Sequence, residues 1–324
     1  MKAIRLTQPC ETSEMQPVEV EKPTLKPGFI IIKVKAFGIN ESEVISRKGK
    51  SDSDFAFPRI LGIEATGIVD EVNTGSKYQP GQQVVTMMGG MGRAIDGGYA
   101  EYVMVKEENV IPFESDLSWD KIGALPEMLQ TAYGSLNEGL NLKKDDILFV
   151  HGGTSTVGLM AIVLGKLIGA KVIATSRREK SLADLKQYGA DYPLIDDEKL
   201  ESEIKKIAPN GVDATLELVG FTVLFKDMAL TRKGGKVCFT GELDGKWTLD
   251  NFTPFMIPTG VFLTSYAGES SDLPANMLQQ ILDDVKAGKI EIPIAHVYKG
   301  LESVGQAQHD LESNKYNGKH VVII

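Results

Sequence analysis

The sequence predicts an α/β protein with two parts, a small β-rich domain followed by a doubly wound parallel sheet, and three observations support this fold class. The first part, up to about residue 117, is rich in short β-like segments that Gly and Pro separate. From Trp119 onward, β-like segments alternate with segments of helix length, which indicates parallel strands joined by right-handed crossovers. A glycine-containing loop at 151–158 joins an apolar strand-like run to a long apolar helical pattern in that second part.

Four segments of the first part are predicted to be strands. In the first of them the apolar residues Ile30, Ile32 and Val34 partly alternate with Lys33 and Lys35, as in a strand with one buried face. Together the segments indicate a distorted β-barrel. They lie at 29–39, 63–72, 82–88 and 99–105.

Five strands are predicted in the second part, with helical patterns between them. A helix at 273–287 follows, and a strand-like ending at 320–324 can return to the first domain. We therefore expect residues 1–117 to form the first domain, 118–261 the parallel-sheet domain, and 262–324 to return to the first domain. The predicted parallel strands lie at 147–150, 171–175, 214–219, 236–240 and 261–266.

The composition is that of an ordinary globular protein. With 324 residues, 42% of them hydrophobic and 24% charged, the chain has enough apolar material for two cores. The 35 Lys and Arg against 44 Asp and Glu give a formal charge of −9, which argues against nucleic-acid or anionic-membrane partners. No signal-peptide core or membrane span is evident, so a cytoplasmic location is expected. Only Cys10 and Cys238 are present, so neither a disulfide framework nor a CxxC pair is available.

The loop at 151–158, HGGTSTVG, is a variant of the dinucleotide-binding fingerprint G-x-G-x-x-G. Gly153 and Gly158 fit its first and third places, and Ser155 stands where the second glycine would let the backbone approach a pyrophosphate. Hydroxyl groups at the positive end of a helix can donate hydrogen bonds to phosphate oxygens, although Ser or Thr before a helix is commonly an N-cap. The predicted contacts are Gly153, Thr154, Ser155, Thr156 and Val157.

The end of the following strand indicates which dinucleotide would bind. An NAD site usually has Asp or Glu there, about 20 residues past the first glycine, to bind the ribose 2′-hydroxyl. This chain instead has Ser176, Arg177, Arg178 and Lys180, which can hydrogen-bond and neutralise a 2′-phosphate. NADPH is therefore favoured over NADH; a solvated helix start is the alternative, since basic residues are common on surfaces.

Seven segments in this order resemble one known family, the zinc-independent quinone oxidoreductases of the medium-chain dehydrogenase/reductase superfamily. The resemblance covers essentially the whole chain and implies a GroES-like barrel, formed by both ends of the chain, around a Rossmann domain, with the active site in the cleft between them. The segments are AFGINESEVISRKG (36–49), PRILGIEATGIV (58–69), GGYAEYVMV (97–105), GALPEMLQTAYGSL (123–136), the unit at 145–180, GGKVCFTGE (234–242) and GKHVVI (318–323).

The positions of zinc ligands in related alcohol dehydrogenases are occupied differently here. Those enzymes have Cys where Asn40 stands, Gly-His-Glu at 62–64 where this chain has Gly-Ile-Glu, and a four-cysteine lobe after 89–98. The four His residues have no ligand spacing, so no metal site is predicted. Without a Lewis acid, alcohol oxidation is disfavoured, whereas quinones and α,β-unsaturated carbonyls accept hydride without metal help.

The resemblance also implies site residues. Asn40 would contact the substrate carbonyl or the nicotinamide ribose, although Asn is also a common turn residue after a strand. Thr131 would lie near the nicotinamide. An enoyl-thioester reductase is less expected, because the tyrosine donor of such enzymes has no counterpart before Tyr78. Further cofactor contacts are implied at Gly220, Thr240, Gly241, Leu263 and Thr264.

The function favoured by these observations is NADPH-dependent, metal-free hydride transfer to a small quinone or enone. Two alternatives stay open: a structural or regulatory protein that binds NADPH without turnover, since fold does not fix function, and an alcohol dehydrogenase-like enzyme. The apolar segment 252–266 could form an edge strand that pairs across a homodimer, as in relatives, or a buried strand.

Overall fold

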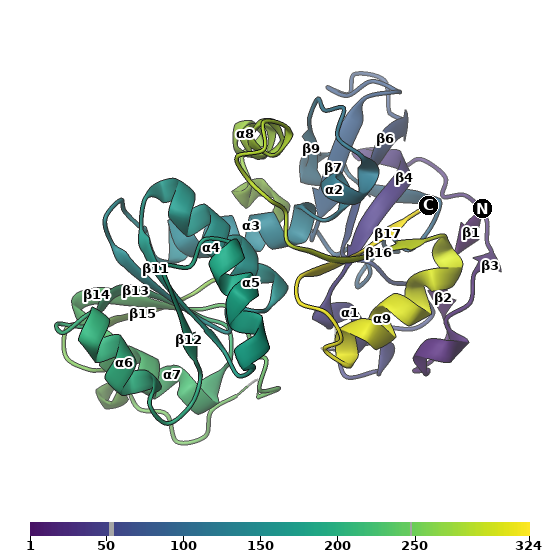
Figure 1. Ribbon diagram of the computed structural model, residues 1–324. Coiled ribbons are helices and arrows are strands. Elements are labelled where there is room, and N and C mark those ends of the chain that lie inside the picture. Colours follow the sequence, from purple (N-terminus) through teal and green to yellow (C-terminus); the bar gives the residue numbers. More distant parts are fainter. Residues whose placement is uncertain (52–54, 247) are drawn as a thin grey trace. The chain divides into compact units, whose positions relative to one another are not determined.

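The structure, a computed structural model, describes residues 1–51, 55–246 and 248–324. It divides into two compact units, one of residues 1–130 with 269–324 and the other of residues 131–268 (Figure 1). Both divisions come later in the chain than the expected boundaries at 117 and 261. Helix α2 (Trp119–Gly123) contacts strands of the first unit, and β15 (Phe262–Ser265) pairs with a strand of the second. No helix of the described part is long and apolar enough to cross a membrane.

The first unit is built on a mostly antiparallel sheet. Its strands follow the order β16-β17-β4-β6-β7-β9, and β8 also pairs with β4. The long strand β4 (Phe29–Ile39) is central and pairs antiparallel with β17 (Lys319–Ile323), so the end of the chain lies beside the strand that leads to Asn40. The other main strands of this sheet are β6 (Glu64–Glu71), β7 (Gln83–Met87), β8 (Tyr102–Lys106), β9 (Val110–Pro112) and β16 (Ile294–Lys299).

Short elements complete this first unit. Helix α1 (Glu41–Arg47) follows β4 directly, α3 (Pro126–Gly134) begins in this unit, and α9 (Val304–Glu312) contacts both α1 and β17. One hydrophobic core unites β4, β6, β8 and α9, which the sequence had indicated as a barrel-like domain. The remaining elements are β1 (Lys2–Ala3), β2 (Arg5–Leu6), β3 (Val18–Glu19), β5 (Arg59–Ile60) and α8 (Ala275–Lys286).

The second unit contains a parallel sheet with the strand order β12-β11-β10-β13-β14-β15. Helices α4 (Thr156–Ile168) and α5 (Leu182–Gln187) cover one face, and α6 (Leu200–Ile207) and α7 (Phe221–Leu230) cover the other (Figure 1). The strand order reverses between β10 and β13, and ligands of such sheets bind at the carboxyl ends of the strands beside this reversal. The strands are β10 (Ile147–His151), β11 (Lys171–Ser176), β12 (Tyr192–Ile195), β13 (Val212–Glu217) and β14 (Thr231–Phe239), followed by β15.

Several strands differ from the sequence prediction: β9 and β16 of the first unit were not predicted, β14 begins earlier than expected, and β12 and β13 differ for identifiable reasons. β12 was not predicted, because it is short and contains Pro193, a residue that sheets accept mainly at their edges. It is indeed the outermost strand beside β11. β13 ends at Glu217 rather than at 219, because the Glu217 side chain accepts hydrogen bonds from the backbone N–H groups of Val219 and Gly220 and turns the chain.

Candidate functional site

The glycine-containing loop follows β10 and forms a tight turn before α4. The left-handed backbone conformation, φ 88°, falls at Gly152, so Gly152 rather than Gly153 permits the turn. A Cβ at Gly158 would lie 2.5 Å from the Gly152 carbonyl oxygen, so only glycine fits where the first turn of α4 approaches the loop. The second position, Ser155, has φ −69°, a value that any residue adopts.

Ser155 is the N-cap of α4. Its Oγ accepts a hydrogen bond from Gly158 N at 3.1 Å and donates one to the Gly152 carbonyl at 2.8 Å. The hydroxyl hydrogen is therefore used inside the loop, so Ser155 stabilises the loop rather than offering a donor to phosphate. The first turn of α4, which includes Thr156 and Val157, contains no acidic side chain, and backbone N–H groups at the N-terminus of a helix generally favour an anion.

The basic turn, residues 176–180, follows β11. Ser176 ends that strand, is buried, and its Oγ accepts a hydrogen bond from Arg178 N at 3.0 Å. This contact bends the chain so that Arg177 and Lys180 are exposed and Arg178 is partly exposed. Because β10 and β11 are neighbouring parallel strands, the basic turn and the glycine loop lie at the same edge of the sheet.

The ends of β13 and β14 bring three more predicted residues together. Glu217 Oε1 accepts hydrogen bonds from Val219 N at 2.6 Å and from Gly220 N at 2.9 Å. The Glu217 carbonyl in turn accepts from Thr240 N at 3.0 Å and Gly241 N at 3.3 Å. Burial raises the pKa of Glu217 to about 8, so a protonated carboxyl group anchors this corner near neutral pH.

The other three predicted residues of this unit are Thr131, Leu263 and Thr264. The Thr131 carbonyl accepts a hydrogen bond from Ser135 Oγ at 2.7 Å, and that hydroxyl is 3.0 Å from Thr240 Oγ1. Leu263 and Thr264 lie within β15 rather than after it; Leu263 packs in a hydrophobic cluster, and Thr264 Oγ1 donates to the Gly139 carbonyl at 3.0 Å. Their side chains thus support the sheet, and both residues remain partly exposed.

Asn40 lies in the other unit, at the junction of β4 and α1, and is almost buried. Its Nδ2 donates to Glu43 Oε1 at 3.3 Å and to Glu64 Oε1 at 2.9 Å, and its Oδ1 accepts from Lys319 Nζ at 2.5 Å. Both amide hydrogens are engaged by carboxylates. A ligand can therefore use only the remaining lone pair of Oδ1, which suits a hydroxyl donor and not a carbonyl oxygen.

Lys319 is the cation of this buried cluster. Its Nζ lies 2.6 Å from Glu64 Oε1 and 3.1 Å from Glu127 Oε2, and its side chain is inaccessible to solvent. Burial alone would lower the pKa of Lys319, but the two carboxylates raise it above its ordinary value. A Cβ at Gly38 would overlap the Lys319 side chain, so this glycine of β4 makes room for the cation.

Glu43 is a second buried acid beside Asn40. It accepts hydrogen bonds from the backbone N–H groups of Asn40 and Ile63, each at 2.8 Å, and from the Tyr99 hydroxyl. Burial raises its pKa to about 7 despite these donors. The orientation of the Asn40 amide is thus fixed by two acids and one lysine.

His151 is a charged residue directly before the glycine loop. Its Nδ1 lies 2.9 Å from both carboxylate oxygens of Asp227, and its Nε2 lies 3.3 Å from Asp196 Oδ2. The ring is buried beside Phe149. Three elements, β10, α7 and the end of β12, therefore meet at one imidazole.

Two family models match the chain. The alcohol dehydrogenase GroES-like domain matches residues 26–115, and the zinc-binding dehydrogenase model matches residues 156–283. The quinone oxidoreductase of Lama guanicoe is 27% identical over 335 residues, which cover 100% of this chain and 98% of that protein. The chain belongs to the quinone oxidoreductase-like family of the medium-chain dehydrogenase/reductase superfamily.

Solved structures confirm the predicted fold class, a Rossmann sheet with a GroES-like domain. The quinone oxidoreductase of Pseudomonas syringae pv. Tomato DC3000 has a TM-score of 0.87 at 20% identity, covering 100% of this chain and 99% of that one. A mycobacterial protein solved with NADPH has a TM-score of 0.85 at 22% identity, with 100% of both chains covered. Members of this family are NAD(P)-binding oxidoreductases, and the basic turn and the last three residues of the glycine loop lie where the second family model matches.

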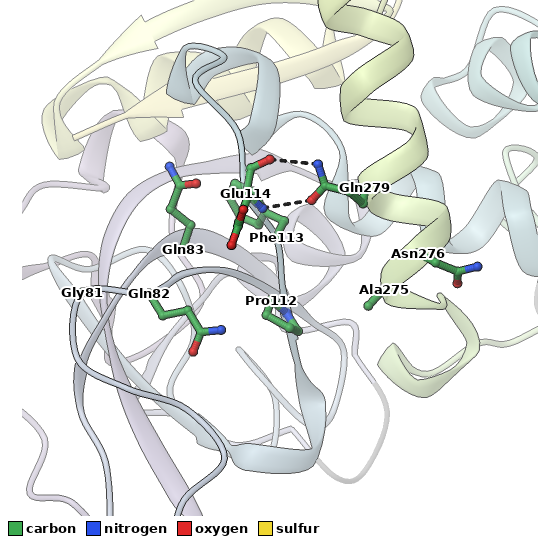
Figure 2. Close-up of a pocket in the computed structure, with 9 residues that line it drawn as sticks. All are labelled: Gly81, Gln82, Gln83, Pro112, Phe113, Glu114, Ala275, Asn276 and Gln279. Carbon is green, nitrogen blue, oxygen red and sulfur yellow. Dashed lines mark hydrogen bonds between the residues drawn. The ribbon is translucent and has the colours of Figure 1, made fainter.

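The described residues contain no cluster suited to a metal ion, and they contain a pocket away from the predicted site residues. Within residues 1–51, 55–246 and 248–324, no three or more His, Cys, Asp or Glu side chains are grouped so as to hold a metal ion. A pocket of about 610 Å³ in the first unit is shown in Figure 2, where the Gln279 side chain and the Glu114 backbone exchange two hydrogen bonds. No predicted site residue lines this pocket, so it carries no part of the proposed chemistry.

Sequence reasoning did not single out His151, Lys319 or Glu43 as site residues. Each is charged or can be charged, and each is buried because partners distant in the sequence surround it. A charged residue in a strand pattern predicts an exposed position, so the sequence carried no signal for this burial. Within the second unit, the structure brings the glycine loop, the basic turn, Gly220 and Thr240 to one edge of the sheet.

Proposed function

We propose that this protein is an NADPH-dependent oxidoreductase that transfers hydride to quinones or small α,β-unsaturated carbonyls without a metal. The observation that carries the proposal is the basic turn: β11 ends in a serine followed by two arginines, where an NAD site would have an acid. The family relationship and the mycobacterial relative solved with NADPH support the same cofactor.

The residues of the second unit fit a dinucleotide. Gly158 lets the first turn of α4 approach the Gly152 carbonyl closely, and the N-terminus of α4 would hold the pyrophosphate. Arg177 and Lys180, both exposed, would neutralise the 2′-phosphate. When bound, NADPH supplies the hydride.

The hydrogen bonds of Asn40 are compatible with the proposed acceptor class. Its amide hydrogens are committed to Glu43 and Glu64, so the carboxamide can accept a hydrogen bond from a ribose or hydroquinone hydroxyl. Conjugated acceptors suit such a site, because their developing negative charge spreads onto oxygen without strong polarisation by the protein. The proposed roles of Asn40 and Thr131 are therefore binding and orientation of the reactants.

Steady-state assays with NADPH and NADH across quinones, enals and simple alcohols test the proposal. We expect turnover with NADPH and a quinone or enal. Binding of NADPH without any turnover would favour the regulatory alternative, and metal-dependent oxidation of alcohols would favour the alcohol dehydrogenase alternative.

A double variant, Arg177→Ala with Arg178→Ala, tests the basic turn itself. The Kd for NADPH should rise about 10- to 100-fold, as expected for losing charge-assisted hydrogen bonds, while the Kd for NADH changes little. Lys205→Ala with Lys206→Ala is the matched control, because these lysines are exposed on α6 and pair with glutamates of the same helix. Equal losses for NADPH and NADH would contradict the assignment of the 2′-phosphate site.

We also propose a homodimer that forms through β15. This strand is the last in the sheet order, and Phe262 on it is 57% exposed. The preceding segment exposes Phe252, Phe255 and Met256, of which Phe255 is 98% exposed. Large exposed apolar side chains beside an open sheet edge are typical of an interface. Light scattering should give the mass of two chains, and Phe262→Asp should give one; a monomeric parent protein would refute the dimer.

A further inference from the structure

The buried imidazole of His151 lies between two carboxylates from different elements. Asp227, on α7, is itself buried and faces Nδ1 with both oxygens at 2.9 Å. Asp196, which follows β12, faces Nε2 at 3.3 Å and keeps 25% of its side chain exposed. The contact of Nε2 with Asp196 is at ion-pair distance and is not a well-aligned hydrogen bond, but a ring that faces an anion at each nitrogen favours the doubly protonated imidazolium, because a neutral imidazole would turn a lone pair toward one of these anions.

The charge of His151 agrees with that geometry. Burial acts to lower the pKa of His151, but Asp196 and Asp227 together raise it to about 10. The imidazolium is therefore permanent at neutral pH. The other titratable groups that act on this cluster are Glu217, which is protonated near neutral pH, and the cations Lys226 and Arg177, from β13, α7 and the basic turn.

Asp196 lies at the corner where the 2′-phosphate would bind. Its backbone N–H donates to the carbonyl of Ser176 at 2.9 Å, and the positive charge of Arg177 helps to lower its pKa, after the larger effect of His151. A carboxylate placed here would oppose a phosphate dianion and would suit the ribose hydroxyl of NADH. The carboxylate of Asp196 beside the basic turn would therefore weaken phosphate binding unless a positive charge offsets it.

We propose that His151 is a specificity-determining residue: its imidazolium holds Asp196 and offsets part of its charge, so that the basic turn accepts the 2′-phosphate of NADPH. This inference rests on the proposed NADPH dependence. His151 acts through Asp196 and is a positioning residue, not a catalytic one. A purely structural role, in which His151 only fastens α7 to β10, would affect NADPH and NADH alike.

A set of variants separates these two roles. His151→Gln combined with Asp227→Asn replaces the buried ion pair by two neutral amides, so that no buried aspartate is left unpaired. The third change, Asp196→Asn, then removes the carboxylate whose charge His151 is proposed to offset. Arg232→Gln is the control, because its partner Asp213 lies near the start of β13, at the opposite edge of the sheet.

The readout is the ratio of the Kd values for NADH and NADPH, measured by fluorescence titration of the full chain, and the same ratio for 5′-AMP and 2′,5′-ADP. The His151→Gln, Asp227→Asn variant leaves the net charge of the cluster at −1 but removes the positive charge nearest to Asp196, so we expect the preference for the phosphorylated ligand to fall about threefold. Adding Asp196→Asn removes the remaining negative charge and should return the ratio at least to the parental value. Arg232→Gln should leave both ratios unchanged.

The outcomes distinguish this inference from the proposed function. If the parent protein prefers NADPH and the His151 variant weakens both ligands equally, the inference is overturned and the proposed function stands. Failure of Asp196→Asn to restore the ratio also overturns it. A parent protein without preference for NADPH overturns the proposed cofactor and this inference together. As a second measurement, the ¹⁵N shifts of the His151 ring should show both nitrogens protonated at pH 8; a neutral ring would refute the charge on which the argument depends.

Discussion

Replacing Lys319 by methionine tests the buried ionic cluster of the first unit. The substitution keeps most of the side-chain volume and removes the charge, which leaves Glu64 and Glu127 without their cation. Removing one partner of a buried ion pair costs about 3–5 kcal/mol, because the remaining charge stays desolvated. Lys319 and Glu64 are both inaccessible to solvent, so the full range applies here and the expected fall in Tm is roughly 6–20 °C.

Calorimetry and urea unfolding followed by circular dichroism measure this effect. Lys205→Met is the matched control, since that lysine is 59% exposed in its pair with Glu201 and the loss should be about 0–1 kcal/mol. Adding Glu64→Gln to Lys319→Met should recover at least about 1 kcal/mol, because it removes the unpaired charge. The single variant should also gain stability as the pH falls, since an unpaired buried carboxyl has a raised pKa and binds a proton more tightly when folded. If Lys319→Met is as stable as Lys205→Met, the cluster does not stabilise the fold as argued.

Three further predictions concern the second unit. Ser155→Ala should lower the free energy of unfolding by about 1 kcal/mol through loss of the α4 N-cap, whereas Ser155→Gly should lower it by only a few tenths of a kcal/mol and leave NADPH binding largely intact. Urea unfolding measures the stability of both variants, and titration measures their NADPH binding. A complete loss of binding in the glycine variant would show that the hydroxyl is essential. The pKa of Glu217 is raised to about 8 from 4.5, so the parent protein should lose stability as the pH rises between these values. Glu217→Gln should abolish that loss when unfolding is measured as a function of pH. An unchanged dependence of stability on pH in this variant would contradict the prediction. The pKa of His151 is raised to about 10 from 6.5, so its contribution to the free energy of unfolding is full below pH 6.5 and is lost as the pH rises through 10. Replacing His151 by Gln and Asp227 by Asn should therefore reduce the fall in stability at alkaline pH. An equally steep fall in that variant would exclude His151 as its source.

Local patterns were sufficient to predict most of the fold. The apolar runs that became β4, β10 and β11 have strand periodicity or strand length and flanking turn residues, and these signals lie within about ten residues. β12 gave no such signal, since it is four residues long and includes a proline.

The site was predictable only where a motif is contiguous. The glycine loop and the basic turn are each read from neighbouring residues, although the turn conformation falls at Gly152, one residue before the expected glycine. The surroundings of Asn40 were not predictable, because they depend on a lysine 279 positions away in the chain. Burial of a charge is decided by the tertiary partners that compensate it, and no local pattern encodes them.

The pairing of β17 with β4 also bears on the order in which the protein can be made. The lysine that compensates Glu64 and Glu127 is carried by residues 319–323, which leave the ribosome after the whole parallel-sheet unit. Until then, the nascent first unit holds Glu64 beside the space left by Gly38 and lacks the cation that pairs with Glu64 and Glu127. The parallel-sheet unit can therefore fold before the first unit is complete. Completion of the first unit requires Lys319 and is thus a late, charge-dependent step in biosynthesis.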